Sequence, residues 1–268
     1  YATFFSTAYR HYAAPTSATI SNGLRLVLAD PLPVPTVTYN VKGVEFEMAV
    51  VDGGTFEMGK SAVDDTETVH SVTLSGYYIG TTEVTQALWN AVMDSNPSSN
   101  KGDNLPVENV SYNDCQTFMS KLSVLLDGVI GSTMAFRLPT EAEWEFAARG
   151  GNRSMETVFS GSNTIDDVAW YKGNSGNVTH LVAQKQANEL GLYDMSGNVD
   201  EWCQDWYDLY TSEAQTNPTG PSSGTHRALR GGSFADEDSY CRMTLRSSLW
   251  PENANGAIGL RIVLARWH

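Results

Sequence analysis

The sequence predicts a mixed α+β fold that is rich in loops, with few helices and short antiparallel strands. Glycine occupies 23 of the 268 positions, and turn residues interrupt nearly every apolar stretch. This pattern favours short strands over long helices. Apolar residues make up 41% of the chain, which is enough to bury a sizeable core.

Three helices are predicted because each begins at a residue whose side chain can accept hydrogen bonds from free backbone N–H groups. In two of them an acid follows three positions later, which is the capping-box pattern. The helix starts are Thr85, Ser111 with Asp114, and Thr140 with Glu143. Gly150 is expected to end the third helix, since glycine readily adopts the left-handed conformation that closes many helices.

The first strands are predicted around a glycine turn. Residues 46–51 and 55–58 flank Asp52-Gly53-Gly54, which is typical of a hairpin. Residues 72–78 are expected to form a third strand. From Gly150 to Gly231 only short elements are apparent, so we expect side-chain networks or a bound ion to hold this region together.

The charge balance argues against two classes of partner. The net charge of −14 repels phosphate backbones and anionic lipid headgroups, so neither nucleic acid nor a membrane surface is expected. No run reaches the roughly 18 to 20 apolar residues of a membrane span. The chain starts at Tyr1 instead of Met, so we expect a trimmed or mature form without its targeting segment. The three cysteines fit neither a disulfide framework nor a C-x-x-C metal site.

The two ends of the chain are similar to each other. Residues 9–29 align without gaps with residues 245–265, and both stretches contain Gly-Leu-Arg followed by Val-Leu-Ala. Residues 1–35 are therefore predicted to be the tail of a preceding repeat plus a linker, followed by one domain over residues 36–268. Chance similarity between two strands is the alternative.

Six segments, taken together and in order, carry a resemblance to a known family. They cover residues 53–59, 82–85, 106–111, 137–145, 191–202, and 230–234 with 259–261. These motifs resemble the formylglycine-generating-enzyme (sulfatase-modifying factor) family over about residues 45 to 264. The resemblance implies a C-type-lectin-type fold.

The same resemblance bears on catalysis. Family enzymes that oxidise a sulfatase cysteine hold copper with two cysteine thiolates that follow the Gly-Gly-Ser segment, because Cu(I) prefers sulfur ligands. Here the second position is Cys241, whereas the first is Asp236. We therefore expect no copper and no enzyme activity. Cys241 is interpreted as a small buried residue.

Other chemistries find no support in the residues. One branch of the family uses iron held by histidines, but the five histidines here are scattered and lack an H-x-x-x-H pattern. No Gly-x-Ser-x-Gly motif indicates a hydrolase. Glu141 and Glu145 lie at a helix start, where acidic side chains are favoured by the helix dipole.

A structural calcium site is implied by the segment from Asp194 to Glu201. Calcium prefers several oxygen ligands of mixed kind. By resemblance, the ligands are the side chains of Asp194 and Glu201 and the carbonyl groups of Gly197 and Val199. An ion-free turn, in which Glu201 accepts backbone N–H bonds, is the alternative. Asp200 stands where the family commonly has tryptophan.

The segment from Arg230 to Arg261 resembles the variable region of proteins from diversity-generating retroelements, including those of treponemes. In such proteins a fixed set of residues supports positions that are rewritten, and the rewritten side chains line a ligand-binding face. We call the fixed set the frame residues: Arg230, Gly231, Gly232, Ser233, Cys241, Arg242, Arg246, Pro251, Ile258, Gly259 and Arg261. We call the others the displayed residues: Phe234, Asp236, Asp238, Tyr240, Leu245, Ser247, Leu249, Trp250, Asn253 and Asn255.

The displayed residues mix aromatic with small polar side chains, as antibody-like binding surfaces do. Ordinary packing and turn formation are the alternative for all of these residues and carry most weight for Phe234 and Leu245, whereas exposure is expected for Trp250. The sequence thus predicts a noncatalytic, monomeric binding protein for a protein or other macromolecular ligand, extracellular or on a bacterial cell surface, often as a lipoprotein in this family. A copper-dependent formylglycine-generating oxidase and a structural subunit of a surface assembly are the alternatives.

Overall fold

The computed structural model describes residues 33–59 and 68–266. From Val34 onward the chain forms one compact unit. The predicted repeat remnant, residues 1–35, lies almost entirely outside the described residues and stays a prediction. No helix in the described part of the chain has the length and apolar character of a membrane span.

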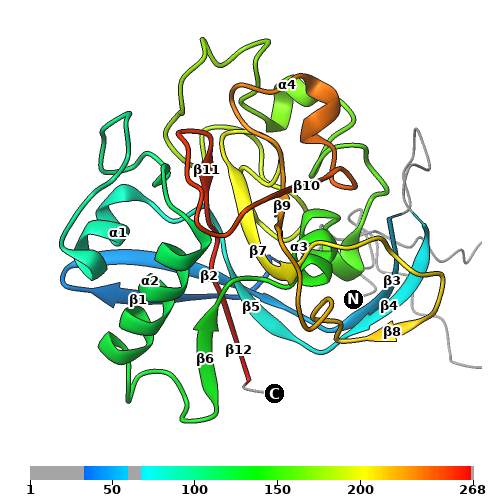
Figure 1. Cartoon of the computed structure of the whole chain (residues 1–268), viewed down its shortest axis with the longest axis horizontal. Coiled ribbons are helices and arrows are strands. Elements are labelled where there is room, and N and C mark those ends of the chain that lie inside the picture. Colours follow the sequence, from blue (N-terminus) through cyan, green and yellow to red (C-terminus); the bar gives the residue numbers. More distant parts are fainter. Residues whose placement is uncertain (1–32, 60–67, 267–268) are drawn as a thin grey trace, which may run out of the picture. The chain divides into compact units, whose positions relative to one another are not determined.

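A five-stranded antiparallel sheet joins the two ends of this unit (Figure 1). The order of its strands is β1-β2-β5-β12-β6. Their bounds are Thr36–Val41 for β1, Val44–Val51 for β2, Tyr77–Gly80 for β5, Val263–Arg266 for β12 and Met134–Arg137 for β6. The final strand β12 therefore lies in the middle of the sheet, between β5 and β6.

Two smaller sheets complete the β structure. One has the order β10-β9-β7-β11, formed by Arg246–Leu249, Arg227–Arg230, Asp200–Trp206 and Ile258–Gly259. In it β9 is antiparallel to both β7 and β10, while β11 runs parallel to β7. The other has the order β3-β4-β8, formed by Gly54–Met58, His70–Leu74 and Gln215–Thr216.

The predicted helix starts are confirmed. The helices of the described residues are α1 (Gln86–Met93), α2 (Tyr112–Leu125), α3 (Glu141–Ala148) and the short α4 (Ile165–Val168), with 3-10 turns at Gly151–Arg153 and Asp238–Cys241. Thr85 caps α1, and both capping boxes form, at Ser111 and Thr140. Gly150 follows α3 with a φ of +88°, in the left-handed region expected of a helix-ending glycine.

The predicted hairpin around Asp52-Gly53-Gly54 is wrong. β2 pairs with β1 and β5, and β3 pairs with β4, so the glycines carry the chain from one sheet into another. The tight turn is instead at Lys42-Gly43, where φ is positive at both residues, as a two-residue hairpin turn requires. The predicted strand over residues 72–78 is two strands, β4 and β5, which belong to different sheets.

The core has two main parts. One packs α1 and α2 against the first sheet and includes the stacked rings of Trp89 and Phe118, whose centres are 5.0 Å apart. The other surrounds α3 and includes Trp144, Phe146 and Met195. The four-stranded sheet contributes Trp202 and Leu229 to the first part and Cys203 and Ala228 to the second, so both of its faces are covered.

Candidate functional site

The segment Asn198–Asp200 at the start of β7 joins several distant parts of the chain. The carbonyl of Asn198 accepts a hydrogen bond from the amide of Phe234, and the amide of Asp200 donates to the carbonyl of Ala257. The buried carboxylate of Glu83 in turn accepts hydrogen bonds from the Asn198 side chain at 2.7 Å and from the Val199 amide at 3.1 Å. Both ends of the predicted display region are thus attached to one buried support.

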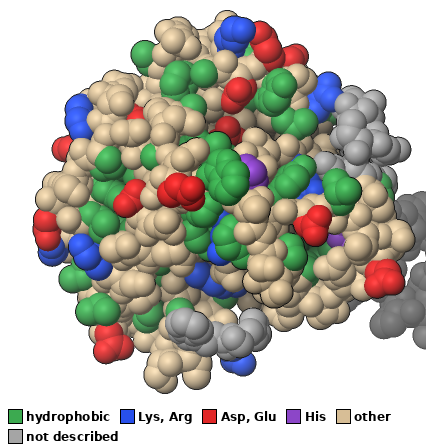
Figure 2. All heavy atoms as spheres, viewed as in Figure 1, with side chains coloured by type: hydrophobic (Ala, Val, Ile, Leu, Met, Phe, Trp, Pro, Cys, Tyr) green, Lys and Arg blue, Asp and Glu red, His purple; other side chains and the backbone are tan. Residues whose placement is uncertain are grey.

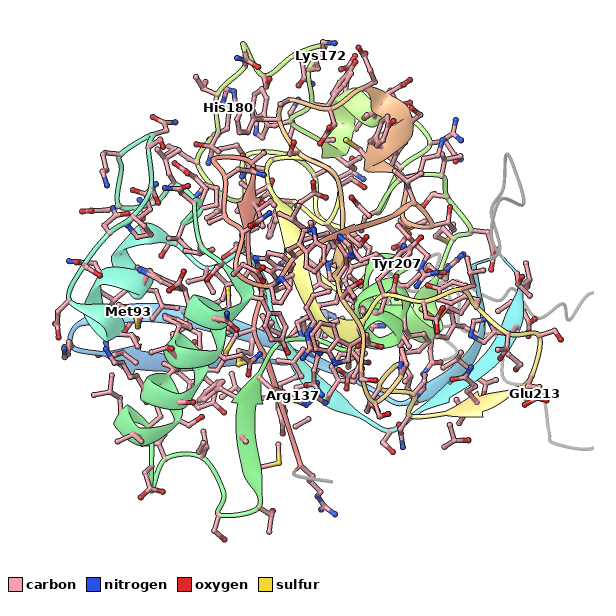
Figure 3. The ribbon with its side chains drawn as sticks, viewed as in Figure 1. Met93, Arg137, Lys172, His180, Tyr207 and Glu213 are labelled. Atoms are coloured by element: carbon pink, nitrogen blue, oxygen red, sulfur yellow. The ribbon has the colours of Figure 1, made fainter. Side chains whose placement is uncertain are left out.

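The loops that contain Lys172 and His180 lie next to the first displayed residues and their support. The amide of Lys172 donates to the carbonyl of Asp236, and the Lys172 ammonium pairs with Glu237 at 2.5 Å. The amide of His180 donates to the side-chain oxygen of Asn198 at 2.9 Å. Figure 3 shows Lys172 and His180 at the same end of the molecule. The region from Gly150 to Gly231 is therefore held by side-chain networks, one of the two devices that its lack of long elements predicts.

Buried ion pairs fix two arginines of the frame, Arg230 and Arg246. The Arg230 guanidinium pairs with Glu145 of α3, and both side chains are fully buried. The Arg246 guanidinium forms two hydrogen bonds with Glu141, at 2.6 and 2.8 Å. Because β9 and β10 carry these arginines, α3 holds the sheet beneath the displayed residues. The acidic residues at the start of α3 therefore serve as ion-pair partners as well as caps.

Arg261 forms the third buried ion pair. Its guanidinium contacts both carboxylate oxygens of Glu201, at distances from 2.7 to 3.0 Å. The indole N–H of Trp144 donates to Glu201 Oε2 at 2.7 Å, so this carboxylate has no free oxygen. The guanidinium also donates to the carbonyl groups of Gly80 and Tyr193. Arg261, the last frame residue, is thereby attached to the end of strand β5 and to the loop that contains Tyr193.

The displayed and frame residues differ in exposure. None of the displayed residues is buried: Asp238, Tyr240, Ser247, Trp250, Asn253 and Asn255 are exposed, while Phe234, Asp236, Leu245 and Leu249 are half-buried. The frame residues are buried except Arg242, Arg246 and Pro251, which are half-buried. The expected exposure of Trp250 is confirmed, at 45%. Figure 2 shows the side of the molecule on which β10 lies, where hydrophobic and acidic side chains are interspersed.

The position that holds copper in the family contains a carboxylate here. Asp236 Oδ2 accepts hydrogen bonds from the Ser233 amide at 2.9 Å and the Ser233 hydroxyl at 2.5 Å. Cys241 is fully buried. Burial, followed by the charges of Asp236 and Asp200, raises the pKa of the Cys241 thiol far above its usual range. A thiolate, which is the form that binds soft metals, is therefore strongly disfavoured.

The predicted calcium ligands fit a cation only in part. Asp194 Oδ1 is buried and has no hydrogen-bond partner, as a free metal ligand would be, while Oδ2 accepts from the Ala183 amide at 2.7 Å. Glu201 does not fit, since Arg261 and Trp144 occupy both of its oxygens. Within the described ranges no cluster of three or more His, Cys, Asp or Glu side chains is arranged around a metal position. The predicted calcium ligands include only two such side chains, with two backbone carbonyl groups, so the absence of a cluster of three does not test the calcium site.

Three residues of the site were not predicted from the sequence. Glu83 was seen only as part of a motif, although it supports Asn198 and Val199 from a buried position. His226 and Arg227 come just before the segment that resembles a variable region, yet the ring of His226 contacts Trp250 and Arg227 lies opposite Leu249 in the sheet. The strand that ends at Arg230, extended backwards by three and four positions, is the signal that reaches Arg227 and His226.

Comparisons with known proteins agree with this geometry. The fold is of the formylglycine-generating-enzyme type, a C-type-lectin-type α+β architecture. Residues 36–266 match the family of sulfatase-modifying factor enzyme 1-like domains, and the chain belongs to this family. The family resemblance seen in the sequence is thereby confirmed.

Individual relatives differ in how much of their length the chain matches. The chain is 33% identical to a chaperone protein LppX of Paenibacillus barcinonensis, over 83% of this chain and 91% of that protein. The solved structure of Treponema denticola variable protein 1 matches with a TM-score of 0.78 and 35% identity, over 87% of this chain and 99% of that chain. A formylglycine-generating enzyme of Streptomyces coelicolor is 36% identical over 59% of this chain, and the match spans about half (52%) of the enzyme's length.

Proposed function

We propose that this domain is a noncatalytic, monomeric binding protein that presents a changeable recognition surface on a formylglycine-generating-enzyme-type scaffold. Its ligand is a protein or another macromolecule, and its place is extracellular or on a bacterial cell surface. The supporting observation is the division of residues 230–261, in which the displayed residues reach solvent while the frame residues are mostly buried. Exposed side chains can change at little cost in stability, whereas buried ion pairs cannot.

Similarity to Treponema denticola variable protein 1 over nearly that whole chain supports the same proposal. The displayed set also contains Tyr240 and Trp250, large side chains that are exposed by 53% and 45%. Aromatic residues of this kind contribute much of the energy of protein recognition.

Variation among isolates tests the proposal. The same gene is sequenced from several isolates, and substitutions are mapped onto the frame and displayed residues. The proposal expects substitutions to concentrate between Phe234 and Ala257, at displayed positions, with the frame unchanged. An even spread along the domain, or changes at Arg230 and Arg246 as frequent as those at Tyr240, would refute diversification.

A copper-dependent oxidase is the second candidate, favoured by the relatives named formylglycine-generating enzyme. The main objection to this function is that Asp236 stands where the first copper-binding cysteine would be, so that Cys241 is the only cysteine left at the site and is buried. Titration with Cu(I) separates the two functions, with the Streptomyces coelicolor enzyme as a positive control. We expect no tight stoichiometric binding. Tight binding that is lost in Cys241→Ser would favour the oxidase.

A further inference from the structure

Arg227 of β9 is held against two aromatic rings. Its guanidinium carbon lies 3.5 Å from the centre of the Trp206 ring and 4.3 Å from that of Tyr112. Nη1 donates a hydrogen bond to the carbonyl of Gln204 at 2.6 Å. A planar guanidinium that stacks on aromatic faces is already oriented, so it loses little further freedom when it binds a ligand.

Arg227 differs from the neighbouring frame arginines because it has no carboxylate partner. Arg230 and Arg246 pair with Glu145 and Glu141, but within residues 33–59 and 68–266 no acidic side chain forms an ion pair with Arg227. Its Nε is buried without a hydrogen-bond partner, so the two terminal nitrogens are the atoms that a ligand can reach. Desolvation lowers the pKa of Arg227, and the more distant Asp205 offsets this only in part. The charge has therefore lost part of its hydration without a directly paired carboxylate, and an anion would supply a counter-charge and hydrogen-bond acceptors.

The position of Arg227 connects it to the displayed residues. In the antiparallel register of β9 and β10, Arg227 lies directly opposite Leu249. Residues directly opposite each other in antiparallel strands place their side chains on the same face. The preceding residue, His226, contacts Trp250, with ring centres 4.5 Å apart. A fixed cation thus lies beside the apolar displayed residue Leu249, one position along the strand from the His226–Trp250 contact.

We propose that Arg227 is a fixed carboxylate-binding residue of the recognition surface, which selects protein ligands that present a carboxylate next to an apolar group. This inference rests on the proposed function. A carboxylate matches the planar fork of a guanidinium. Polyanions fit less well, because the net charge of −14 repels them at long range. Arg227 supplies one fixed contact, and Leu249 sets the neighbouring part of the specificity.

Benzoate is a suitable probe because it combines a carboxylate with an apolar ring. The full chain is labelled with ¹³C and ¹⁵N in arginine, and the guanidinium signals are followed by NMR during titration with benzoate, with neutral benzamide, and with inorganic phosphate. We expect a saturable shift of the Arg227 signal with benzoate, weak and in the millimolar range. Benzamide and phosphate should bind more weakly by about tenfold or more, the typical difference for a charge-assisted bidentate contact.

Variants complete the test. Arg227→Gln should abolish benzoate binding, and Arg227→Lys should weaken it, since lysine keeps the charge but not the fork. Lys121→Gln, which removes an exposed cation on α2, should leave it unchanged. If Arg227→Gln does not fold, the wild-type titration and Arg227→Lys still decide. No shift at Arg227, equal binding of benzamide, or equal binding of phosphate would each overturn the assignment. None of these outcomes affects the display proposal, which the isolate sequences test separately.

Discussion

Arg230 and Glu145 form a fully buried ion pair that ties strand β9 to helix α3. Glu145 also accepts hydrogen bonds from Arg149 at 2.8 and 2.9 Å, and from the amide of Gly59 at 2.9 Å. Despite burial, which acts to raise it, the pKa of Glu145 is lowered by the charges of Arg230 and Arg149. The carboxylate is therefore ionised at neutral pH, and all of its contacts are with the scaffold and none with the displayed residues.

Removing this charge should destabilise the domain. Glu145→Gln leaves two buried guanidinium groups without their shared counter-charge, and breaking such a pair typically costs about 3–5 kcal/mol. Urea unfolding at neutral pH measures the loss. The exposed Glu252→Gln serves as the matched control and should change the free energy of unfolding by less than about 0.5 kcal/mol. A cost at Glu145 no larger than that of the control would show that the pair is not part of the frame.

Truncation of displayed residues should cost little. Tyr240→Ala and Asn253→Ala remove exposed side chains, so each is expected to change the free energy of unfolding by about 0.5 kcal/mol or less. Ile258→Ala, in the frame, removes a buried side chain and should cost about 2–5 kcal/mol. Thermal and urea unfolding of the three variants compare them directly. If Tyr240→Ala cost as much as Ile258→Ala, the division into frame and displayed residues would be wrong.

Asp205 makes stability depend on pH. Burial, followed by the charge of Glu141, raises its pKa to about 8. An unfolded chain releases this proton near pKa ~3.9, so between the two values only the folded chain holds it. The free energy of unfolding therefore gains a contribution that is complete below about pH 4 and falls as pH rises, by at most about 1.4 kcal/mol per pH unit, until it is lost near pH 8.

The variant Asp205→Asn isolates this contribution, because asparagine keeps the neutral form and can still accept the hydrogen bond from the Glu141 amide. Its stability relative to the wild type should increase steadily from about pH 4 to about pH 8. Urea unfolding across this range measures the difference, with the exposed Asp208→Asn as control. A difference that does not change with pH would mean that Asp205 is ionised in the folded chain.

Calcium binding at Asp194 stays a prediction with a direct test. A bound ion stabilises the folded chain by about 2.7 kcal/mol when its concentration is about 100 times the dissociation constant. Replacing a chelator with calcium should therefore raise the melting temperature of the wild type but not that of Asp194→Ala. A melting temperature that chelator does not change would exclude a structural calcium ion.

The elements that could be predicted from the sequence are those that depend on neighbouring residues. The caps at Thr85, Ser111 and Thr140 need only a side chain and an amide three positions away. Strand pairing depends instead on distant residues, which is why Gly53-Gly54 predicts a hairpin that the structure does not contain. A glycine pair marks a sharp change of direction but not the sheet that the chain enters next.

In the site, too, features that depend on neighbouring residues could be predicted and those that depend on distant residues could not. The frame and displayed residues follow from motifs, and their exposure agrees with that division. The occupation of Glu201 by Arg261 joins residues 60 positions apart, so no local pattern reveals it. No sequence motif singles out Arg227, because its distinguishing property is the lack of an ion-pair partner among the described residues, which depends on where the surrounding carboxylates lie in the fold.

The central claim is that the displayed residues determine binding while the frame determines folding. A library in which only the displayed positions are randomised, on the otherwise unchanged chain, tests this claim most directly when it is selected against hen lysozyme, an arbitrary folded protein. The account predicts that most library members fold and that selected members bind lysozyme through their new side chains, with binding lost when those positions are restored to the original residues. A library that mostly fails to fold, or that yields no lysozyme binders, would contradict the account.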